Sequence, residues 1–362
     1  MSLPKDLARR LREILALPTA PFCEGRVHAA ILGAVRASKR LRARSDAFGN
    51  LLVVFGRGRP RLLFACHTDH PALRAEGDGT AAIVGGIRAA ALKGARLRGF
   101  DARGVRGEVV GAVGGKKAGV VRIATSVPCT RGEPLLLDLP RPSLGGRFLR
   151  ARAIDDLCAV AACLALFDRL AATRFRGCVG ALFTRAEEVG FAGALGWVRT
   201  TKTPRSTTIV NLEMSHARPH TPQGNGPILR VGDRITTFDP AVTTELEEAA
   251  RSHQAKDGSF RWQRALMDGG ACEATVYAHA GFRTGALCLP LLNYHNHAPE
   301  GGVAREYVHR DDAAGLVRWM EAYARGFSRF DAGRARQRRL DALWKKNRAR
   351  LVATAGEGRA RR

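Results

Sequence analysis

Short apolar runs that alternate with helical stretches constrain the fold of this chain more than any other feature. Runs of strand length occur at residues 178–183, 207–212 and 285–292, and apolar positions at helical spacing occur at 158–170, 190–198 and 316–327. Two further strands, at 48–55 and 61–66, are joined by a Gly/Pro-rich turn, and amphipathic stretches at 7–15 and 28–35 precede them. Alternating strands and helices are typical of a sheet with helices on both faces. We therefore predict an α/β fold built on a mainly parallel sheet flanked by helices.

Residues 72–145 have a different texture from the rest of the chain. Short runs of Val, Ile and Ala are broken repeatedly by Gly, and no helical period is present. This segment predicts a small all-β domain inserted into the α/β domain. We expect residues 1–71 and 146–330 to form the catalytic domain, 72–145 the inserted β domain, and 331–362 a basic C-terminal tail.

Carboxylates and imidazoles follow successive predicted strands. In an open α/β sheet, ligands bind beyond the carboxyl ends of the strands, so these positions are where chemistry is expected. Five strand-like segments end in this way, which independent coincidences do not explain well. The residues concerned are His67-Thr68-Asp69, Asp155-Asp156, Glu187-Glu188, Glu213 and Tyr294-His295-Asn296-His297.

Two imidazoles and three or more carboxylates suit a pair of divalent ions such as Zn, Co or Mn. Paired metals polarise a carbonyl group and activate a bridging water, while a separate carboxylate takes the proton of that water. The adjacent Glu187 and Glu188 permit this division of roles, because neighbouring side chains point in different directions. The pattern predicts a two-metal hydrolase that acts on a carbonyl group; the resemblance described next implies that the bond is an amide.

The order of these motifs resembles that of the co-catalytic metallopeptidases of the M20, M28 and M42 families. The run Glu187-Glu188-Val189-Gly190 through Ala194 is similar to the signature of the M42 family, the glutamyl or tetrahedral aminopeptidase type. A long β-rich insert between His67 and Asp155 is also typical of M42 proteins. The resemblance extends to about Phe330 and implies a zinc-peptidase-like fold, an aminopeptidase acting on short peptides, and self-assembly into a homo-oligomer.

The resemblance also implies a role for each motif residue. His67, Asp155 and Glu213 would bind one metal, and Asp155, Glu188 and His295 the other, with Zn as the expected ion and Co or Mn as alternatives. Glu187 would be the general base, and Asp69 would orient His67. The chain departs from the family pattern at Leu157, at Glu213, and in the run Gly269-Gly270-Ala271-Cys272-Glu273-Ala274.

Several residues have plainer interpretations. His297 follows the same strand as His295 and is the alternative ligand. Asp155 and Asp156 could cap the following helix, and Glu187 and Glu188 could complement a helix dipole. His70, His216 and His220 have no evident partner, so we expect them at the surface or at the rim of a pocket. For a free substrate ammonium group, Asp156 and Glu273 are the candidate acceptors.

The charge of the chain raises the question of an anionic partner. The net charge is +26, from 50 Arg and 9 Lys against 33 acidic residues, and residues 331–362 alone carry a net +8. We expect nucleic acid to bind, if at all, only through this tail. Eight scattered Cys and the lack of a long apolar run predict a cytoplasmic protein with reduced thiols and no membrane association. Two other hypotheses remain open: a non-peptidase amide hydrolase or deacylase, and a nucleic-acid-associated protein that retains the fold.

Overall fold

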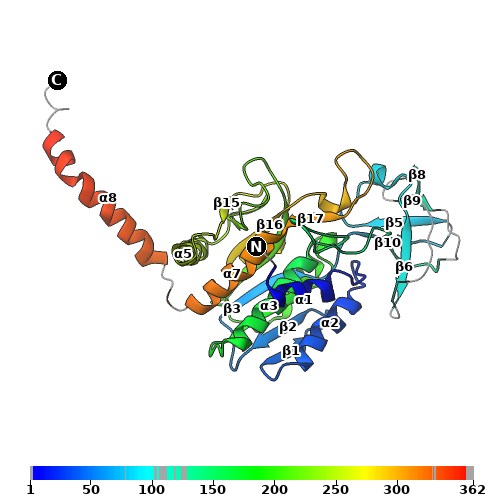
Figure 1. The fold of residues 1–362 in the computed structure, drawn as a ribbon, viewed down its shortest axis with the longest axis horizontal. Helices are drawn as coiled ribbons and strands as arrows, with labels where there is room; N and C mark the ends of the chain where they lie inside the picture. Colours follow the sequence, from blue (N-terminus) through cyan, green and yellow to red (C-terminus); the bar gives the residue numbers. More distant parts are fainter. Residues whose placement is uncertain are drawn as a thin grey trace.

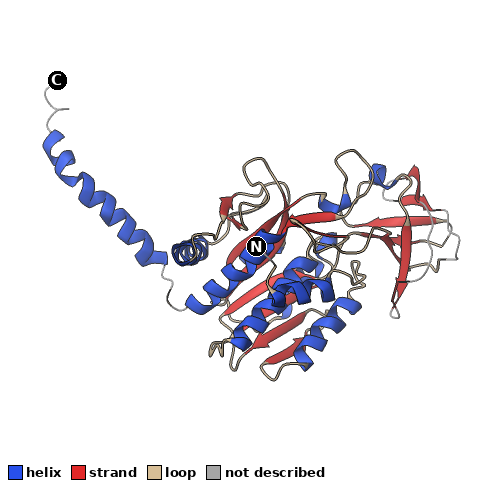
Figure 2. Ribbon diagram, viewed as in Figure 1, coloured by secondary structure: helices blue, strands red, loops and turns tan. Residues whose placement is uncertain are grey.

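The computed structural model describes residues 3–77, 79–101, 104–105, 112–117, 120–123, 129–327, 329 and 332–355. Within these ranges the chain forms a mixed α/β body, and a second, all-β unit extends from one end of it (Figures 1 and 2). A long helix projects from the opposite end of the body (Figure 1). No helix in the described ranges is both long enough and apolar enough to cross a lipid bilayer.

An eight-stranded sheet forms the centre of the body. From edge to edge its strands are β1 (Leu41–Ser45), β2 (Leu51–Phe55), β12 (Val179–Thr184), β3 (Leu62–His67), β13 (Thr208–His216), β16 (Arg283–Leu291), β14 (Ile228–Arg230) and β15 (Gln263–Ala265). The four central strands, β12, β3, β13 and β16, are parallel. The pairs β1–β2, β2–β12 and β14–β16 are antiparallel. The parallel strands therefore all end at one edge of the sheet.

Helices cover both faces of this sheet. They are α1 (Lys5–Ile14), α2 (Gly25–Arg36), α3 (Leu157–Ala172), α4 (Ala192–Thr200), α5 (Pro240–Lys256), α6 (Glu273–His279) and α7 (Arg310–Gly326). Successive side chains of a strand point to opposite faces, and β3 shows the consequence. Phe64 and Cys66 pack into the core that contains α1, α3 and α7, whereas Leu63 and Ala65 pack with Trp197 in the core of α4 and α6.

The second unit is a seven-stranded antiparallel sheet. Its strands, from edge to edge, are β7 (Gly104–Val105), β6 (Leu97–Asp101), β10 (Pro134–Leu137), β4 (Ala72–Ala75), β5 (Thr80–Val84), β9 (Val120–Ile123) and β8 (Ala112–Lys117). A short 3-10 helix, η1 (Ala89–Leu92), follows β5. Leu73, Leu97, Val121 and Leu135 form a core of its own beneath the sheet. We propose that this sheet is a separate domain inserted between β3 and the segment Phe148–Ala151.

Two further elements lie outside the two large sheets. A two-stranded antiparallel sheet pairs β11 (Phe148–Ala151) with β17 (Glu306–His309), and it brings together two segments that are distant in the sequence. The C-terminal helix α8 (Ala332–Thr354) points away from the body beyond α5 (Figure 1). Every α8 side chain whose exposure is described is exposed to solvent.

The predicted α/β fold is confirmed, and antiparallel strands extend the parallel core at both sides. The expected strands at 178–183, 207–212 and 285–292 correspond to β12, β13 and β16. The strands on either side of the turn at 56–60 are not neighbours, because β12 lies between β2 and β3. The sequence patterns do not predict α5 or the three-residue strands β14 and β15, since such short strands carry too little periodicity.

Candidate metal centre

The parallel strands β3, β12, β13 and β16 supply four of the five predicted metal ligands, and β11 of the two-stranded sheet brings the fifth, Asp155, to the same place. His67 is the last residue of β3, Glu213 lies within β13, and Glu188 follows β12 in the 3-10 helix η2 (Glu187–Val189). Asp155 follows β11, and His295 follows β16 in the 3-10 helix η3 (Tyr294–Asn296). All five side chains are buried or nearly so.

Asp155 lies between two histidines. Its Oδ1 is 3.2 Å from His67 Nε2, and its Oδ2 is 3.8 Å from His295 Nε2. Glu213 Oε1 is 3.8 Å from His67 Nε2, and Glu188 Oε2 is 3.3 Å from His295 Nε2. A tetrahedral zinc ion with bonds of about 2.0–2.2 Å separates its ligand atoms by roughly 3.3–3.6 Å. The distances therefore fit two groups of ligands that share Asp155, namely His67, Asp155 and Glu213, and Asp155, Glu188 and His295.

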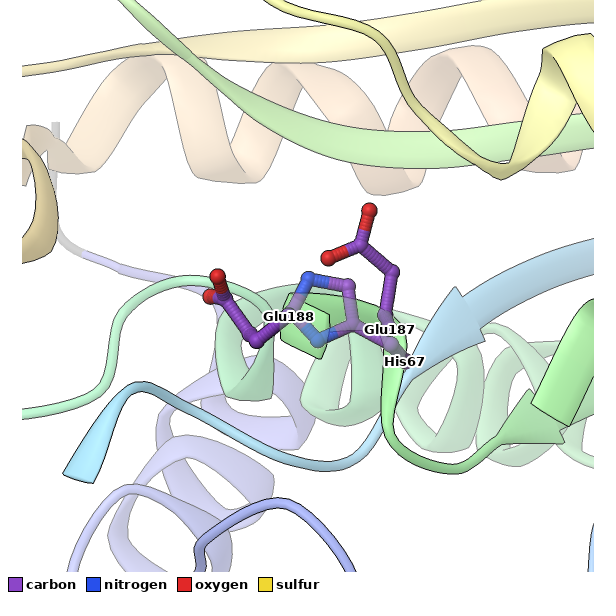
Figure 3. A group of neighbouring side chains, drawn as sticks. All are labelled: His67, Glu187 and Glu188. Atoms are coloured by element: carbon purple, nitrogen blue, oxygen red, sulfur yellow. The ribbon is translucent and has the colours of Figure 1, made fainter. Parts of the chain in front are cut away.

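Glu187 and Glu188 diverge although they are neighbours. In Figure 3 their carboxylates lie on either side of the His67 ring. Asp69 fixes the backbone of this pair: its Oδ1 accepts the N–H of Glu187 at 3.0 Å and its Oδ2 accepts the N–H of Glu188 at 3.1 Å. The Asp69 Oδ1 is 3.5 Å from His67 Nδ1, which is longer than a normal hydrogen bond. Asp69 therefore holds the glutamates more closely than it holds the histidine.

A third combination of ligands is also possible on distance alone. Ligand atoms of His67, Glu187 and Glu188 lie within 4.8 Å of one another. The Glu187 carboxylate nevertheless makes no ion-pair contact with either His67 or His295, unlike the other carboxylates of the cluster, Asp155, Glu188 and Glu213. Glu187 therefore lies beside the predicted ligands without an ion-pair contact to either histidine.

The electrostatics of the cluster favour bound cations. Burial raises the pKa of Asp155 to about 7, and burial also raises the pKa values of Glu187 and Glu188 well above the ordinary range of a glutamate. Burial lowers the pKa of His295 to about 4, which keeps its imidazole neutral, as a metal ligand must be. The buried Glu188 Oε1 has no hydrogen-bond partner among the described residues. Converging carboxylates that are costly to bury alone fit a site completed by divalent ions.

A cavity of about 130 Å³ opens onto this cluster. Five residues of the cluster line it: His67, Asp155, Glu187, Glu188 and Glu213. The remaining lining residues are Met214, Ser215, His216, Arg218, Arg230, Met267, Gly269, Gly270, Ala271 and Tyr294. Pockets that bury a whole drug-sized ligand typically have volumes of roughly 300–1,000 Å³. The cavity therefore admits only a small part of a ligand, such as the end of a chain.

Some residues singled out in the sequence lie elsewhere. Asp156 is fully buried behind the cluster and its Oδ2 accepts the N–H of His67 at 3.3 Å, so its side chain does not cap α3. Glu273 is also fully buried, and its Oε2 accepts hydrogen bonds from the hydroxyls of Thr184 and Tyr277. Neither carboxylate lines the cavity. The expectation that they receive a substrate ammonium group is therefore wrong.

The other histidines are also placed by the structure. His297 Nε2 accepts the N–H of Arg88 at 3.0 Å, so its ring turns toward the inserted sheet and away from Asp155. His70 is fully buried, contrary to the expected surface position, with Nδ1 2.6 Å from the Asp155 carbonyl and Nε2 3.0 Å from Asn296 Oδ1. His216 is exposed and lines the cavity.

A comparison of the sequence with known protein families agrees with the order of these motifs. A family model described as M42 glutamyl aminopeptidase matches residues 123–314, slightly more than half of the chain. The chain belongs to the M42 glutamyl aminopeptidase family. The matched region contains Asp155, Glu187, Glu188, Glu213 and His295. This M42 protein is accordingly a metal-dependent aminopeptidase, as the resemblance of its motifs implied.

Solved structures share the fold of this M42 protein across nearly its whole length. The TET1 peptidase of Pyrococcus horikoshii has 22% identity and a TM-score of 0.73, over 88% of this chain and 99% of that one. A TET aminopeptidase from a marine sediment archaeon of the Thaumarchaeota has 18% identity and a TM-score of 0.75, over 89% and 97%. A protein named as an endoglucanase from Thermotoga maritima has 14% identity and a TM-score of 0.64, over 87% and 96%. No curated protein sequence matches the chain.

Sequence reasoning missed three residues that surround the cluster of this M42 protein. Glu306 and Gly86 contact the His295 segment, and Arg230 lies in the wall of the cavity. Nothing in the spacing marks Arg230 among 50 arginines. Neither Glu306 nor Gly86 follows a strand of the central sheet, so neither occupies a position where the sequence pattern predicts a site residue. For the segment after β3, the position of His70, three residues after His67, was the one sequence feature that indicated a further buried polar group.

Proposed function

We propose that this aminopeptidase uses two divalent metal ions, one held by His67, Asp155 and Glu213 and the other by Asp155, Glu188 and His295. The observation that carries the proposal is the position of Asp155, whose two oxygens face different histidines. Oδ1 is turned toward His67 and Oδ2 toward His295. A carboxylate in this position can bridge two ions. Zn, Co and Mn all accept such imidazole and carboxylate ligands.

When bound, a pair of divalent ions polarises a substrate carbonyl group and lowers the pKa of water. The protein must then supply a general base that is not itself a metal ligand. Glu187 is the proposed base, because its carboxylate lines the cavity without an ion-pair contact to His67 or His295. Asp69 is a positioning residue, since it fixes the Glu187 backbone through the hydrogen bond to its N–H.

The cavity suits the unblocked end of a peptide. Its small volume of about 130 Å³ admits a terminal residue in preference to an internal segment. Glu188 Oε1 is a buried acceptor without a hydrogen-bond partner among the described residues, while Oε2 of the same carboxylate faces His295. We propose that this oxygen receives the free ammonium group of the substrate, in place of Asp156 and Glu273.

The basic residues in the lining of the cavity suit an acidic side chain of the substrate. Arg218 and Arg230 both line the cavity, and His216 lies beside them. The Arg230 guanidinium already donates to Ser215 Oγ and to the carbonyls of Met267 and Gly270. Within the described part of the chain, no acceptor takes a hydrogen bond from the Arg218 guanidinium. Arg218 is therefore the proposed partner for the carboxylate of an N-terminal Glu or Asp.

Two kinds of partner besides substrate belong to this proposal. Solved relatives are reported as a dodecamer and as a tetrahedron or octahedral shell, which supports a homo-oligomer here. Helix α8 carries eight Arg or Lys and one Asp, and its described side chains are all exposed. Such a helix can bind the phosphates of nucleic acid through charge.

Metal removal and restoration test the proposed activity. The purified protein should hydrolyse an unblocked peptide, lose that activity after treatment with a chelator, and regain it with Zn, Co or Mn. The same protocol with the Asp155→Ala variant should restore nothing. Full activity in the chelated protein, or restored activity in the variant, would contradict a centre that depends on Asp155.

A further inference from the structure

His295 adopts a conformation that its own sequence does not favour. Its φ is 52°, and the flanking Asn293 and Asn296 also have positive φ, at 55° and 63°. Few non-glycine residues enter this left-handed region; Asn and His do so more readily than most, and a conformation of this kind that the surroundings impose costs roughly 1–3 kcal/mol. The segment after β16 must therefore be held in place by contacts from elsewhere in the molecule.

Glu306 provides the first of these contacts. Its side chain is fully buried at the start of β17. Oε1 accepts the backbone N–H of His295 at 2.9 Å, and Oε2 accepts the N–H of Asp155 at 3.0 Å and that of Ile154 at 2.9 Å. Because β17 pairs with β11, with Glu306 opposite Ala151, the carboxylate lies between the two ligand segments. One side chain thus sets the distance between Asp155 and His295.

Gly86, in the loop after β5, provides the second contact. Its carbonyl oxygen is 3.3 Å from His295 Nδ1. A carbonyl can only accept a hydrogen bond, so this contact favours the tautomer with a proton on Nδ1 and leaves Nε2 free as a ligand atom. The approach is close: a Cβ on Gly86 would lie 2.2 Å from His295 Nδ1. Only glycine fits this position without moving the ring.

We propose that Glu306 and Gly86 are positioning residues for His295, so that the inserted β sheet completes one half of the metal centre. The inference rests on the proposed two-metal centre. The loop that carries Gly86 makes a second bond to the same segment, since the N–H of Arg88 donates to His297. The contact of the insert is therefore with the His295 loop as a whole.

The two groups of metal ligands differ in their contacts with the inserted sheet. Among the described residues, His67 and Glu213 make no hydrogen bond with the inserted sheet, whereas His295 makes one. A shift of the inserted sheet should then weaken the ion held by Asp155, Glu188 and His295 before it weakens the other. Loss of an outer partner of a metal-ligating histidine typically lowers affinity by 10–100-fold, so about this loss is expected.

The first test is Gly86→Ala, with Gly145→Ala as a matched control. Gly145 lies at the end of the same inserted segment, and a Cβ there would meet no atom within 4 Å. Full-length proteins are stripped of metal and titrated with Zn²⁺, and bound metal is measured by elemental analysis after dialysis. Gly86→Ala should lower the affinity of one of two ions by at least about tenfold. Gly145→Ala should bind like wild type, and the unfolding midpoints of the metal-free proteins should coincide.

Glu306→Gln gives an independent test. The amide keeps one acceptor oxygen but turns an NH₂ group toward backbone N–H donors, so it cannot hold both ligand segments. Glu245→Gln is the control, because Glu245 is also buried and accepts from Arg283 and Tyr323 away from the site. The loss of Zn²⁺ affinity should appear in Glu306→Gln and be absent from Glu245→Gln.

A double variant distinguishes positioning from a general disturbance. If Gly86 acts through His295, then Gly86→Ala adds no further loss of metal to a protein that already carries His295→Ala. Additive losses would overturn the inference, as would wild-type affinity for both ions in Gly86→Ala and Glu306→Gln. A wild-type protein that binds no metal would instead contradict the proposed function, so the two failures can be told apart.

Discussion

The carboxylate of Asp69 accepts the backbone N–H of Glu187 at 3.0 Å, although 118 positions separate the two residues in the chain. The other oxygen of the same carboxylate accepts the N–H of Glu188. One side chain at the end of β3 thus fixes the turn after β12, and with it the directions of two adjacent glutamates. The two carboxylates make different contacts, since only that of Glu188 forms an ion pair with His295, so we propose different roles that substitution can separate.

Glu187→Gln and Glu188→Gln should fail in different ways. Removal of a general base costs about 10²–10⁴-fold in turnover, so Glu187→Gln should lower kcat by at least about 10²-fold while both ions remain bound. Glu188→Gln should lower the occupancy of one ion, because Glu188 faces His295 at 3.3 Å. Steady-state kinetics and metal analysis on both variants make the comparison. Loss of metal in Glu187→Gln with full occupancy in Glu188→Gln would reverse the two assignments.

Arg218 should control the preference for the N-terminal side chain. Wild-type protein should favour N-terminal Glu over Leu in kcat/KM for otherwise identical substrates. Arg218→Ala should reduce this ratio about fivefold, the scale of a partly exposed ion pair of about 1 kcal/mol. Arg59→Ala is the control, since Arg59 is exposed and does not line the cavity. If the Glu-to-Leu ratio of kcat/KM is unchanged in Arg218→Ala, then Arg218 does not recognise the charge of the N-terminal side chain.

A free N-terminus should be preferred over an acetylated one. The ammonium group can be received by Glu188 Oε1, which is buried and has no partner among the described residues. An acetyl group removes the charge and leaves that oxygen unpaired, at a cost of about 1–3 kcal/mol or more. The measurement is the ratio of kcat/KM for a matched pair of peptides with Zn, Co and Mn in turn. If the acetylated peptide is cleaved tenfold better with every metal, the protein is a deacylase.

The strand ends of the central sheet were predictable because parallel strands impose a rule. Apolar runs of strand length marked β3, β12 and β16, and the residues after them had one chemical character. The structure brings His67, Asp155, Glu188, Glu213 and His295 together at that edge. The choice between His295 and His297 was not decided by the pattern, because both follow the same strand. It depends on the positive φ of His295, which spacing does not encode.

The supporting residues were not predictable for a different reason. Glu306 acts through three backbone N–H groups, two of them more than 150 positions away, and Gly86 acts through a carbonyl oxygen. Backbone partners leave no mark on the sequence, since every residue has an N–H and a C=O group. Asp156 and Glu273 were predicted from the sequence but do not take part in the cavity. Both lie near the motifs in the sequence, and the fold buries both carboxylates in hydrogen bonds with protein groups.

Helix α8 should be dispensable for hydrolysis. It lies at the far end of the body from the inserted sheet and carries a net charge of +7 over 23 residues (Figure 1). A chain that ends after residue 331 should keep wild-type kcat/KM and lose affinity for single-stranded RNA. Binding of RNA by the full chain should weaken steeply between about 50 and 200 mM salt. Tight RNA binding by the shortened chain that does not respond to salt would place the nucleic-acid site elsewhere.

The number of metal ions bound per chain is the most direct measure of the two-metal centre. Wild-type protein, stripped and reloaded with Zn²⁺, should hold two ions per chain after dialysis. Asp155→Ala should hold fewer than one, because Asp155 belongs to both ligand groups. His67→Ala and His295→Ala should each retain one. A wild-type chain that binds no ion, or an Asp155→Ala variant that still binds two, would contradict the shared carboxylate on which the account depends.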